Sequence, residues 1–119
     1  MNKQELLKRT KTYALRVIKA VQALPHDDIS TVLGRQLLRA GTSVGANYRA
    51  ACRAKSTADF VNKLKIVEEE CDESLYWMEL LIESGIIALR RFEQLMREGD
   101  ELLAIIVAAI KTTRTARLA

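Results

Sequence analysis

Hydrophobic side chains recur along this sequence with the spacing of α-helices rather than β-strands. Between about residues 3 and 24, apolar residues are separated by three, four and seven positions, which places them on one side of a helix. The segments 29–54, 56–84 and 89–113 follow the same rule. The third segment has the clearest apolar stripe, made of Phe60, Leu64, Val67, Cys71, Leu75, Met78 and Ile82. We therefore expect four long helices that form a single domain over residues 1–119.

The residues between these segments are ones that begin or end helices. Pro25 lacks a backbone N–H and constrains the residue before it, so it ends the first segment. Ser56 and Asp59 have the spacing of a capping box at the start of the third segment. Gly85 is the residue type that most readily closes a helix in the left-handed conformation, and residues 114–119 are expected to fray. Four helices with short connections predict an all-α fold, an antiparallel up-down-up-down four-helix bundle.

Three glycines, Gly34, Gly41 and Gly45, lie inside the second segment. A glycine in a helix interior costs about 1 kcal/mol relative to alanine, so their presence needs a reason. Either the helix breaks at one of them, or they allow the backbone of another helix to approach closely. The apolar spacing continues through all of them, which favours an unbroken helix that packs closely against a neighbour.

The composition narrows the class of protein further. The chain has 119 residues, of which 49% are hydrophobic, with one proline and five glycines, and a β-sandwich or barrel needs more turn residues than this. No stretch of about 18 uncharged apolar residues is present to span a membrane, and the N-terminus lacks the apolar run of a secretion signal. We expect a cytoplasmic protein that does not enter the membrane, with Cys52 and Cys71 in the reduced form.

The sequence offers few residues for catalysis or metal binding. Its one histidine, His26, lies in the connection after the first helix, where a solvated surface role is the usual one. There is no CxxC pair for zinc and no Glu-x-x-His motif of the kind that binds di-iron in helical bundles. The acidic run at residues 68–73 points in several directions around a helix, which favours a solvated or partner-facing surface over a metal site. We therefore expect a protein that is not an enzyme and has no catalytic residue, metal or cofactor.

The second segment carries four arginines and no acidic residue between positions 29 and 54. At about 100° per residue, these arginines fall within roughly 40° of one line and span about 27 Å along the helix axis. Guanidinium groups in such a row can hold phosphates, pair with the acidic third segment of the same or a neighbouring subunit, or remain solvated. The candidate nucleic-acid contacts are Arg35, Arg39, Arg49 and Arg53, with Lys55 and Lys63 as weaker additions.

Ile66, Trp77 and Leu80 lie to one side of the apolar stripe of the third segment. An apolar flank that includes a tryptophan is typical of a subunit interface. A wide apolar arc that packs against both neighbouring helices of the bundle explains the same pattern. We expect these residues to contribute to the interface of a homo-oligomer, with the packing explanation as the alternative.

Several short runs in this chain match those of a known family. They are residues 38–49 (LRAGTSVGANYR), 54–56 (AKS) and 76–81 (YWMELL), together with Asp59-Phe60 and Lys63-Leu64. Over nearly its whole length the chain resembles the four-helix-bundle protein family encoded in intervening sequences of bacterial large-subunit ribosomal RNA genes. It is also similar to the accessory variability determinant of diversity-generating retroelements.

The resemblance implies an antiparallel bundle that assembles into a homopentameric ring. It also implies two partners besides a second copy of the chain, because the accessory protein of this wider group binds nucleic acid and a reverse transcriptase, partly through its basic surface. The intervening-sequence proteins themselves bring no settled biochemical role. Two hypotheses follow. One is an oligomeric accessory protein that binds RNA or DNA or acts as a scaffold, and the other is a purely structural homo-oligomer that does not bind nucleic acid.

Overall fold

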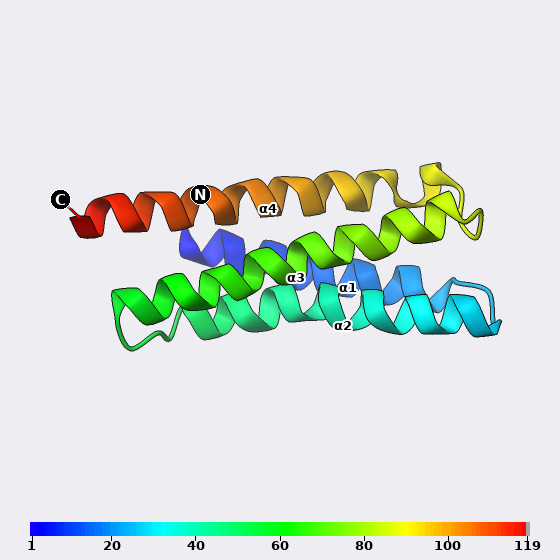
Figure 1. The fold of residues 1–119 in the computed structure, drawn as a ribbon, viewed down its shortest axis with the longest axis horizontal. Helices are drawn as coiled ribbons and strands as arrows, with labels where there is room; N and C mark the ends of the chain where they lie inside the picture. The colour runs from blue at the N-terminus through cyan, green and yellow to red at the C-terminus, as the bar shows by residue number, and fades with distance from the viewer. Residues whose placement is uncertain (119) are drawn as a thin grey trace.

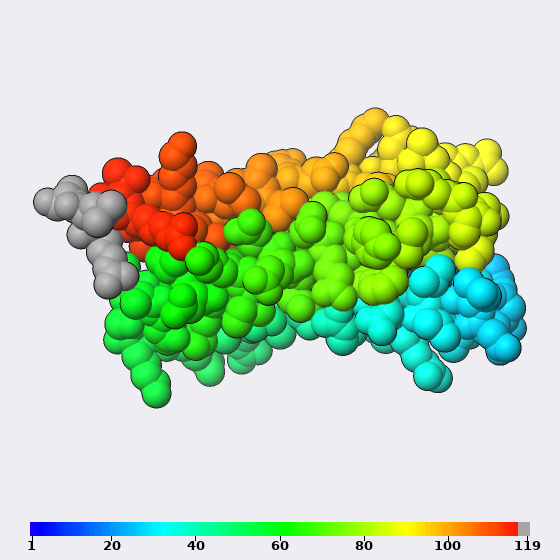
Figure 2. Space-filling view, in the orientation of Figure 1, coloured from blue at the N-terminus to red at the C-terminus, as the bar shows by residue number. Residues whose placement is uncertain are grey.

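The structure of the protein, a computed structural model, describes residues 1–118, with side chains through residue 116. It consists of α1 (Lys3–Gln22), α2 (Asp28–Ala51), α3 (Thr57–Glu83) and α4 (Leu89–Leu118). The helices run antiparallel to their sequence neighbours in a rod of 51 × 21 × 20 Å (Figure 1). Each helix contacts the next one along the chain and α1 also contacts α4, whereas among the described residues α1 and α3 are diagonal, as are α2 and α4. The predicted all-α, up-down-up-down bundle is confirmed. Figure 2 shows the face of the rod on which α3 lies between α2 and α4.

Side chains cap the first three helices at their N-terminal ends. Asn2 accepts a hydrogen bond from the N–H of Glu5 at 2.8 Å, and Asp27 caps α2 in the same way. Ser56 accepts a hydrogen bond from the N–H of Asp59 at 3.1 Å, as the capping-box spacing predicted. Each of these bonds satisfies a backbone donor that has no partner within its helix.

The ends of the first three helices lie close to the predicted positions. α1 ends at Gln22 rather than near Leu24, because the residue before a proline is disfavoured in the helical conformation. α2 ends at Ala51, three residues early, and the chain continues in a tighter turn in which the N–H of Arg53 bonds three residues back. Gly85 follows α3 in the predicted left-handed conformation, with a φ of +81°.

The C-terminal end of α4 differs from the prediction. The predicted end of this helix near residue 113 was wrong, because α4 continues to Leu118; Ala119, part of the tail that was expected to fray, lies outside the described residues. No glycine or proline interrupts this part of the sequence, so nothing local stops the helix. Thr113 lines a cleft together with Phe60 of α3, which places the last turns of α4 beside the beginning of α3. In Figure 1 these two ends project together beyond the start of α1.

Side chains from all four helices meet in one hydrophobic core along the axis of the rod. Most of the predicted stripe of α3 is buried, whereas Phe60 and Ile82 at its two ends are only partly buried. The largest fully buried side chains are Tyr13, Leu37, Leu64, Met78, Leu81, Leu102 and Ile106. Outside this core, none of the described helices contains an apolar stretch long enough to cross a membrane.

The glycines of α2 allow α1 to approach closely. A Cβ atom at Gly41 would lie 2.7 Å from a methyl carbon of Val17, and one at Gly45 would lie 3.2 Å from the carbonyl oxygen of Thr10. Gly34 also faces α1. Because α2 is unbroken through all of these positions, the prediction of close packing rather than a break is confirmed.

A chain of hydrogen bonds crosses the core between two diagonal helices. The hydroxyl of Tyr13 in α1 lies 2.8 Å from Oγ of Ser74 in α3, and this Oγ lies 2.7 Å from the carbonyl oxygen of Cys71. The single proton of Ser74 goes to the carbonyl, so Tyr13 must be the donor to Ser74. Gly99 of α4 provides the space, since a Cβ there would lie 2.8 Å from the Tyr13 oxygen. Burial raises the pKa of Tyr13, which keeps the phenol protonated and able to donate.

Replacing Gly41 with alanine should destabilise the bundle, because the added methyl group overlaps the stiff, β-branched side chain of Val17. Overpacking costs about 1–3 kcal/mol, and the better helix propensity of alanine offsets about 1 kcal/mol of this. We expect the free energy of unfolding in urea to fall by about 1 kcal/mol. The double variant G41A/V17A is the control, and it should be more stable than the sum of the single effects by at least about 1 kcal/mol. Strictly additive effects would contradict the close contact.

Replacing Ser74 with alanine should cost more stability than replacing Tyr13 with phenylalanine. Ser74→Ala leaves the buried Tyr13 hydroxyl without an acceptor, at about 1–3 kcal/mol, whereas Tyr13→Phe leaves Ser74 bonded to a carbonyl, at about 0.5–1.5 kcal/mol. Urea unfolding followed by circular dichroism measures both. The double variant should lose less than the sum of the two, because both single changes break the same bond. Equal losses, or the reverse order, would be inconsistent with the assigned direction of donation.

Candidate nucleic-acid interface

The arginines that were predicted to form a basic stripe on α2 are all exposed to solvent. The structure nevertheless divides them into groups with different surroundings. Arg39 is bonded to α3, whereas Arg49 and Arg53 line a groove together with residues of α1. Arg35 forms no ion pair with any described residue. Arg35, Arg39 and Arg49 lie on α2, Arg53 lies in the turn after it, and these cations are not equally available to a ligand.

The guanidinium group of Arg39 is held by two carboxylates of α3. Its Nη1 lies 2.9 Å from Oε2 of Glu70, and its Nη2 donates to Oε1 of Glu73. The hydrogen bond with Glu73 is the main cause of a raised pKa at Arg39. A phosphate that bound Arg39 would have to compete with both carboxylates. The hypothesis of pairing with the acidic third helix thus describes Arg39, and the pairing occurs within one subunit.

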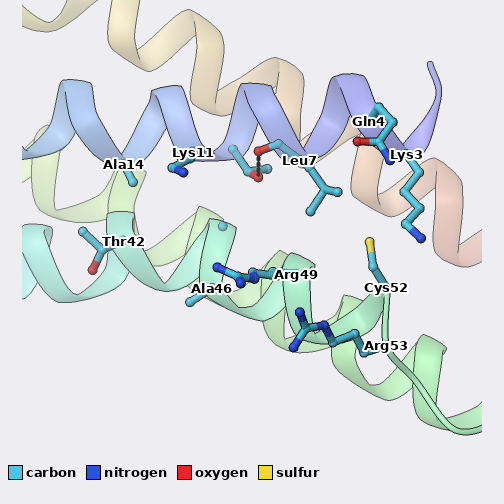
Figure 3. A pocket seen from close by; sticks show the side chains of 12 residues that line it. Lys3, Gln4, Leu7, Lys11, Ala14, Thr42, Ala46, Arg49, Cys52 and Arg53 are labelled. Atoms are coloured by element: carbon cyan, nitrogen blue, oxygen red, sulfur yellow. Dashed lines mark hydrogen bonds between the residues drawn. The ribbon is translucent and has the colours of Figure 1, made fainter.

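Arg49 and Arg53 form one wall of a groove between α1 and α2 with a volume of about 670 Å³ (Figure 3). Lys3 and Lys11 of α1 belong to the opposite wall, and in Figure 3 the side chain of Lys3 extends toward α2. None of the described residues that line the groove is acidic. The rest of the lining consists of Gln4, Leu7, Thr10, Ala14, Thr42, Gly45, Ala46 and Cys52. A concave surface with cations on both sides concentrates positive potential and attracts anions.

Small residues keep this groove open between its charged walls. Thr42, Gly45 and Ala46 contribute from α2, and Ala14 contributes from α1. Gly45 also brings the two helix backbones together, because its missing side chain leaves room for the backbone at Thr10. Short side chains and backbone, together with Leu7 from α1, therefore line the groove between the basic side chains of the two helices (Figure 3). This geometry suits an extended ligand that carries negative charge.

Lys55 and Lys63, the weaker candidates, lie next to the groove. With Arg49 and Arg53 they line an adjoining cleft of about 400 Å³. Lys63 pairs with Asp59 at 2.9 Å, and this interaction lowers the pKa of Asp59. The charge of Lys63 is therefore partly neutralised, whereas Lys55 has no ion-pair partner in the part of the chain that the structure describes. The structure thus brings these four predicted residues together. The other two, Arg35 and Arg39, lie nearer the N-terminal end of α2.

Lys3 and Lys11 were not among the predicted contacts. A signal for them was present in the sequence, because residues 3–24 carry six basic side chains and one acidic side chain. Their position across from Arg49 and Arg53 depends on which faces α1 and α2 turn toward each other. That relation is set by the packing of the two helices, so the charge pattern of either helix alone does not reveal it.

The predicted interface residues lie along the edge of α3 that adjoins α2. Ile66 is exposed, and Trp77 and Leu80 are half-buried. Trp77 packs against the core, and its Nε1 donates to Oε1 of Glu73 at 3.2 Å. The same Glu73 also pairs with Arg39 of α2, so Trp77 and Arg39 are linked through one carboxylate. Packing within the bundle thus accounts for the buried part of the Trp77 side chain. The apolar side chain of Ile66 remains exposed at the surface.

Two apolar side chains of α2 extend this surface. Val32 is 59% exposed, and Ile29 is 63% exposed. The contact between Arg39 and Glu70 fixes the register of the antiparallel pair α2 and α3. Val32 lies about two turns before Arg39, and Trp77 lies about two turns after Glu70, so they fall at the same level of the rod. At this level both helices therefore carry an apolar side chain, whereas Ile66, about one turn before Glu70, lies on the other side of the ion pair.

The remaining groups with potential chemistry do not converge on a site. Cys52 and Cys71 are free, and burial raises the pKa of Cys71 to about 12, so its thiol stays protonated. Cys52 is half-buried in the lining of the groove, and His26 is exposed in the connection between α1 and α2. In the region that the structure describes, no three histidine, cysteine, aspartate or glutamate side chains are grouped so that they could hold a metal ion, and this includes the acidic run at residues 68–73.

Comparisons with known proteins agree with the sequence resemblance. The family model described as 23S rRNA-intervening sequence protein matches residues 2–108. The crystal structure of a protein of unknown function from the S23 ribosomal protein family of Bacteroides thetaiotaomicron VPI-5482 is similar, with 34% sequence identity and a TM-score of 0.86. The match covers 93% of this chain and 99% of that chain. A comparison with curated proteins gives no match. On the basis of the family model and the structural match, the chain belongs to the 23S rRNA-intervening sequence protein family.

Proposed function

We propose that this protein is a non-enzymatic accessory or scaffold protein that binds nucleic acid in the groove between α1 and α2. One observation carries the proposal. Lys3 and Lys11 of one helix and Arg49 and Arg53 of another line a single groove, and no acidic residue is among its described lining. Such a surface matches the regular negative charge of a sugar–phosphate backbone.

The composition of the groove supports contacts to phosphates rather than to bases. Arginine can hold a phosphate with two parallel hydrogen bonds, and lysine contributes a flexible point charge. The described lining contains no aromatic side chain on which a base could stack. Contacts to the backbone alone fix the position of a nucleic acid without reading its sequence. The proposed binding is therefore independent of sequence and strongly dependent on salt.

The other predicted cations have lesser roles in this proposal. Lys55 extends the groove into the adjoining cleft, and Lys63 contributes less because Asp59 already pairs with it. Arg35 lies nearer the N-terminal end of α2, outside the groove, and would be an additional phosphate contact. Arg39 serves mainly to join α2 to α3, since two carboxylates occupy its guanidinium group.

The second candidate function is a structural one, a homo-oligomer that assembles through the apolar surface of α2 and α3. The exposed side chains of Ile29, Val32 and Ile66 favour it, because exposed apolar side chains on two neighbouring helices gain free energy when they are covered. A ring of five copies is the size that the family resemblance implies. Assembly and nucleic-acid binding use different surfaces in this proposal, so one does not exclude the other.

Titration of fluorescent RNA and DNA oligonucleotides by fluorescence anisotropy at several salt concentrations tests nucleic-acid binding. We expect R49Q/R53Q to bind more weakly and to reduce the slope of log Kobs against log salt by about 1.8 for a duplex or about 1.4 for a single strand, since two phosphate contacts are lost. The control K65Q/K111Q removes the same charge from exposed positions on α3 and α4 and should keep the wild-type slope. Wild-type protein that does not bind at low salt would refute the proposal, as would an unchanged slope in R49Q/R53Q.

Analytical ultracentrifugation of I66E/L80E tests the structural candidate. Two carboxylates on the edge of α3 should dissociate the wild-type oligomer into monomers, because burial of unpaired charges at an interface is costly. Leu15→Glu is the matched control, since Leu15 is 56% exposed on α1, away from this surface, and the variant should remain assembled. The candidate fails if the wild-type protein is monomeric or if I66E/L80E stays assembled.

A further inference from the structure

A second basic cleft lies between the C-terminal half of α1 and the beginning of α4. Its volume is about 330 Å³. Arg16 and Lys19 line it from α1, and Arg90 and Arg91 line it from α4. The rest of the described lining is uncharged, with Ala20, Ala23, Ile87, Phe92, Gln94 and Leu95. Within the described residues, none of these four cations forms an ion pair. Four like charges thus surround a small cavity without a counter-charge.

The position of the two arginines in α4 is unfavourable for the helix itself. The N-terminal end of a helix carries partial positive charge, so acidic side chains stabilise the first turn and basic ones destabilise it. α1, α2 and α3 follow this rule with Glu5, Asp28 and Asp59 in their first turns. α4 has no acidic residue in its first turn, and Arg90 and Arg91 occupy that turn instead. An arrangement that opposes local stability is expected where a ligand, here an anion, provides the compensation.

The outer face of α1 connects this cleft with the groove between α1 and α2. Lys8, Lys11 and Lys19 are exposed on it at helical spacing. The acidic residue of α1, Glu5, is bonded to Asn2 in the first turn, and Glu98 and Glu101 of α4 pair with Arg9. From Lys3 to Lys19 the cations extend over about 24 Å of helix axis. At about 3.4 Å per phosphate along one strand of a duplex, this length corresponds to about seven phosphates.

We propose that the cleft formed by Arg16, Lys19, Arg90 and Arg91 is a second phosphate-binding site, which a nucleic acid seated in the groove between α1 and α2 reaches across the outer face of α1. The inference rests on the proposed function and adds the path and the extent of the bound backbone. Contact at both ends of α1 requires a ligand longer than a single nucleotide, which favours a polynucleotide over a free small anion.

The test compares R90Q/R91Q with wild-type protein in binding a 16-base-pair RNA duplex across a range of salt concentrations. The variant should bind more weakly, with a slope of log Kobs against log salt that is smaller by about 1.8. Its effect should add to that of R49Q/R53Q on the logarithmic scale, because the two sites are separate. The melting temperature of R90Q/R91Q without ligand should equal or exceed that of the wild type, since two cations leave the positive end of a helix. The control K65Q/K111Q should leave both the slope and the affinity unchanged.

The outcomes separate this inference from the proposed function. If R49Q/R53Q weakens duplex binding and R90Q/R91Q does not, the second site is refuted and the groove remains. If wild-type protein does not bind the duplex at all, both proposals fall. Inorganic pyrophosphate provides the second arm. Thermal stabilisation of the wild type by pyrophosphate that R90Q/R91Q abolishes, with duplex binding unchanged, would overturn the polynucleotide assignment and leave a small-anion site.

Discussion

The close contact between α1 and α2 depends on the absence of side chains at Gly41 and Gly45. A methyl group at Gly41 would overlap Val17, and one at Gly45 would make a tight contact with the backbone at Thr10. This approach fixes the depth of the groove and holds the basic side chains of the two helices on either side of it. The glycines lower the intrinsic helix propensity of α2, and the packing of α1 against them provides the compensation.

Ion pairs determine which of the many cations are free to meet a ligand. Arg9 joins α1 to α4 through Glu98 and Glu101, and Arg39 joins α2 to α3 through Glu70 and Glu73. These arginines hold neighbouring helices together at the edges of the bundle, where exposed pairs contribute modestly to stability. Among the described residues, eight cations without such partners line the two clefts beside α1, namely Lys3, Lys11, Arg16, Lys19, Arg49, Arg53, Arg90 and Arg91. The net charge of the chain, +4, therefore understates the positive potential of that surface.

The chain belongs to the 23S rRNA-intervening sequence protein family, and its structural relative is a protein of unknown function. Neither finding assigns an activity. Four-helix bundles serve many unrelated roles, so the fold alone does not assign one. The proposals therefore rest on particular side chains of this chain. They also separate two surfaces, a cationic one around α1 and an apolar one along the edge of α2 and α3, which can work at the same time.

The sequence alone determined the four helices, most of their ends and the side of each helix that faces the core. These features depend on local spacing, on capping residues such as Ser56 and on Gly85, all of which act within a few residues along the chain. It also placed Arg35, Arg39 and Arg49 on α2, whereas Arg53 lies in the turn just beyond that helix. It could not show the surroundings of each arginine, because the carboxylates that bond Arg39 lie on α3 and the lysines across the groove from Arg49 lie on α1. The packing of the whole core sets the register of the helices and the sides that they turn toward each other. This arrangement pairs Arg39 with carboxylates of α3 and places Arg49 across the groove from α1. For the same physical reason, Lys3 and Lys11 became part of the candidate interface only in the folded protein.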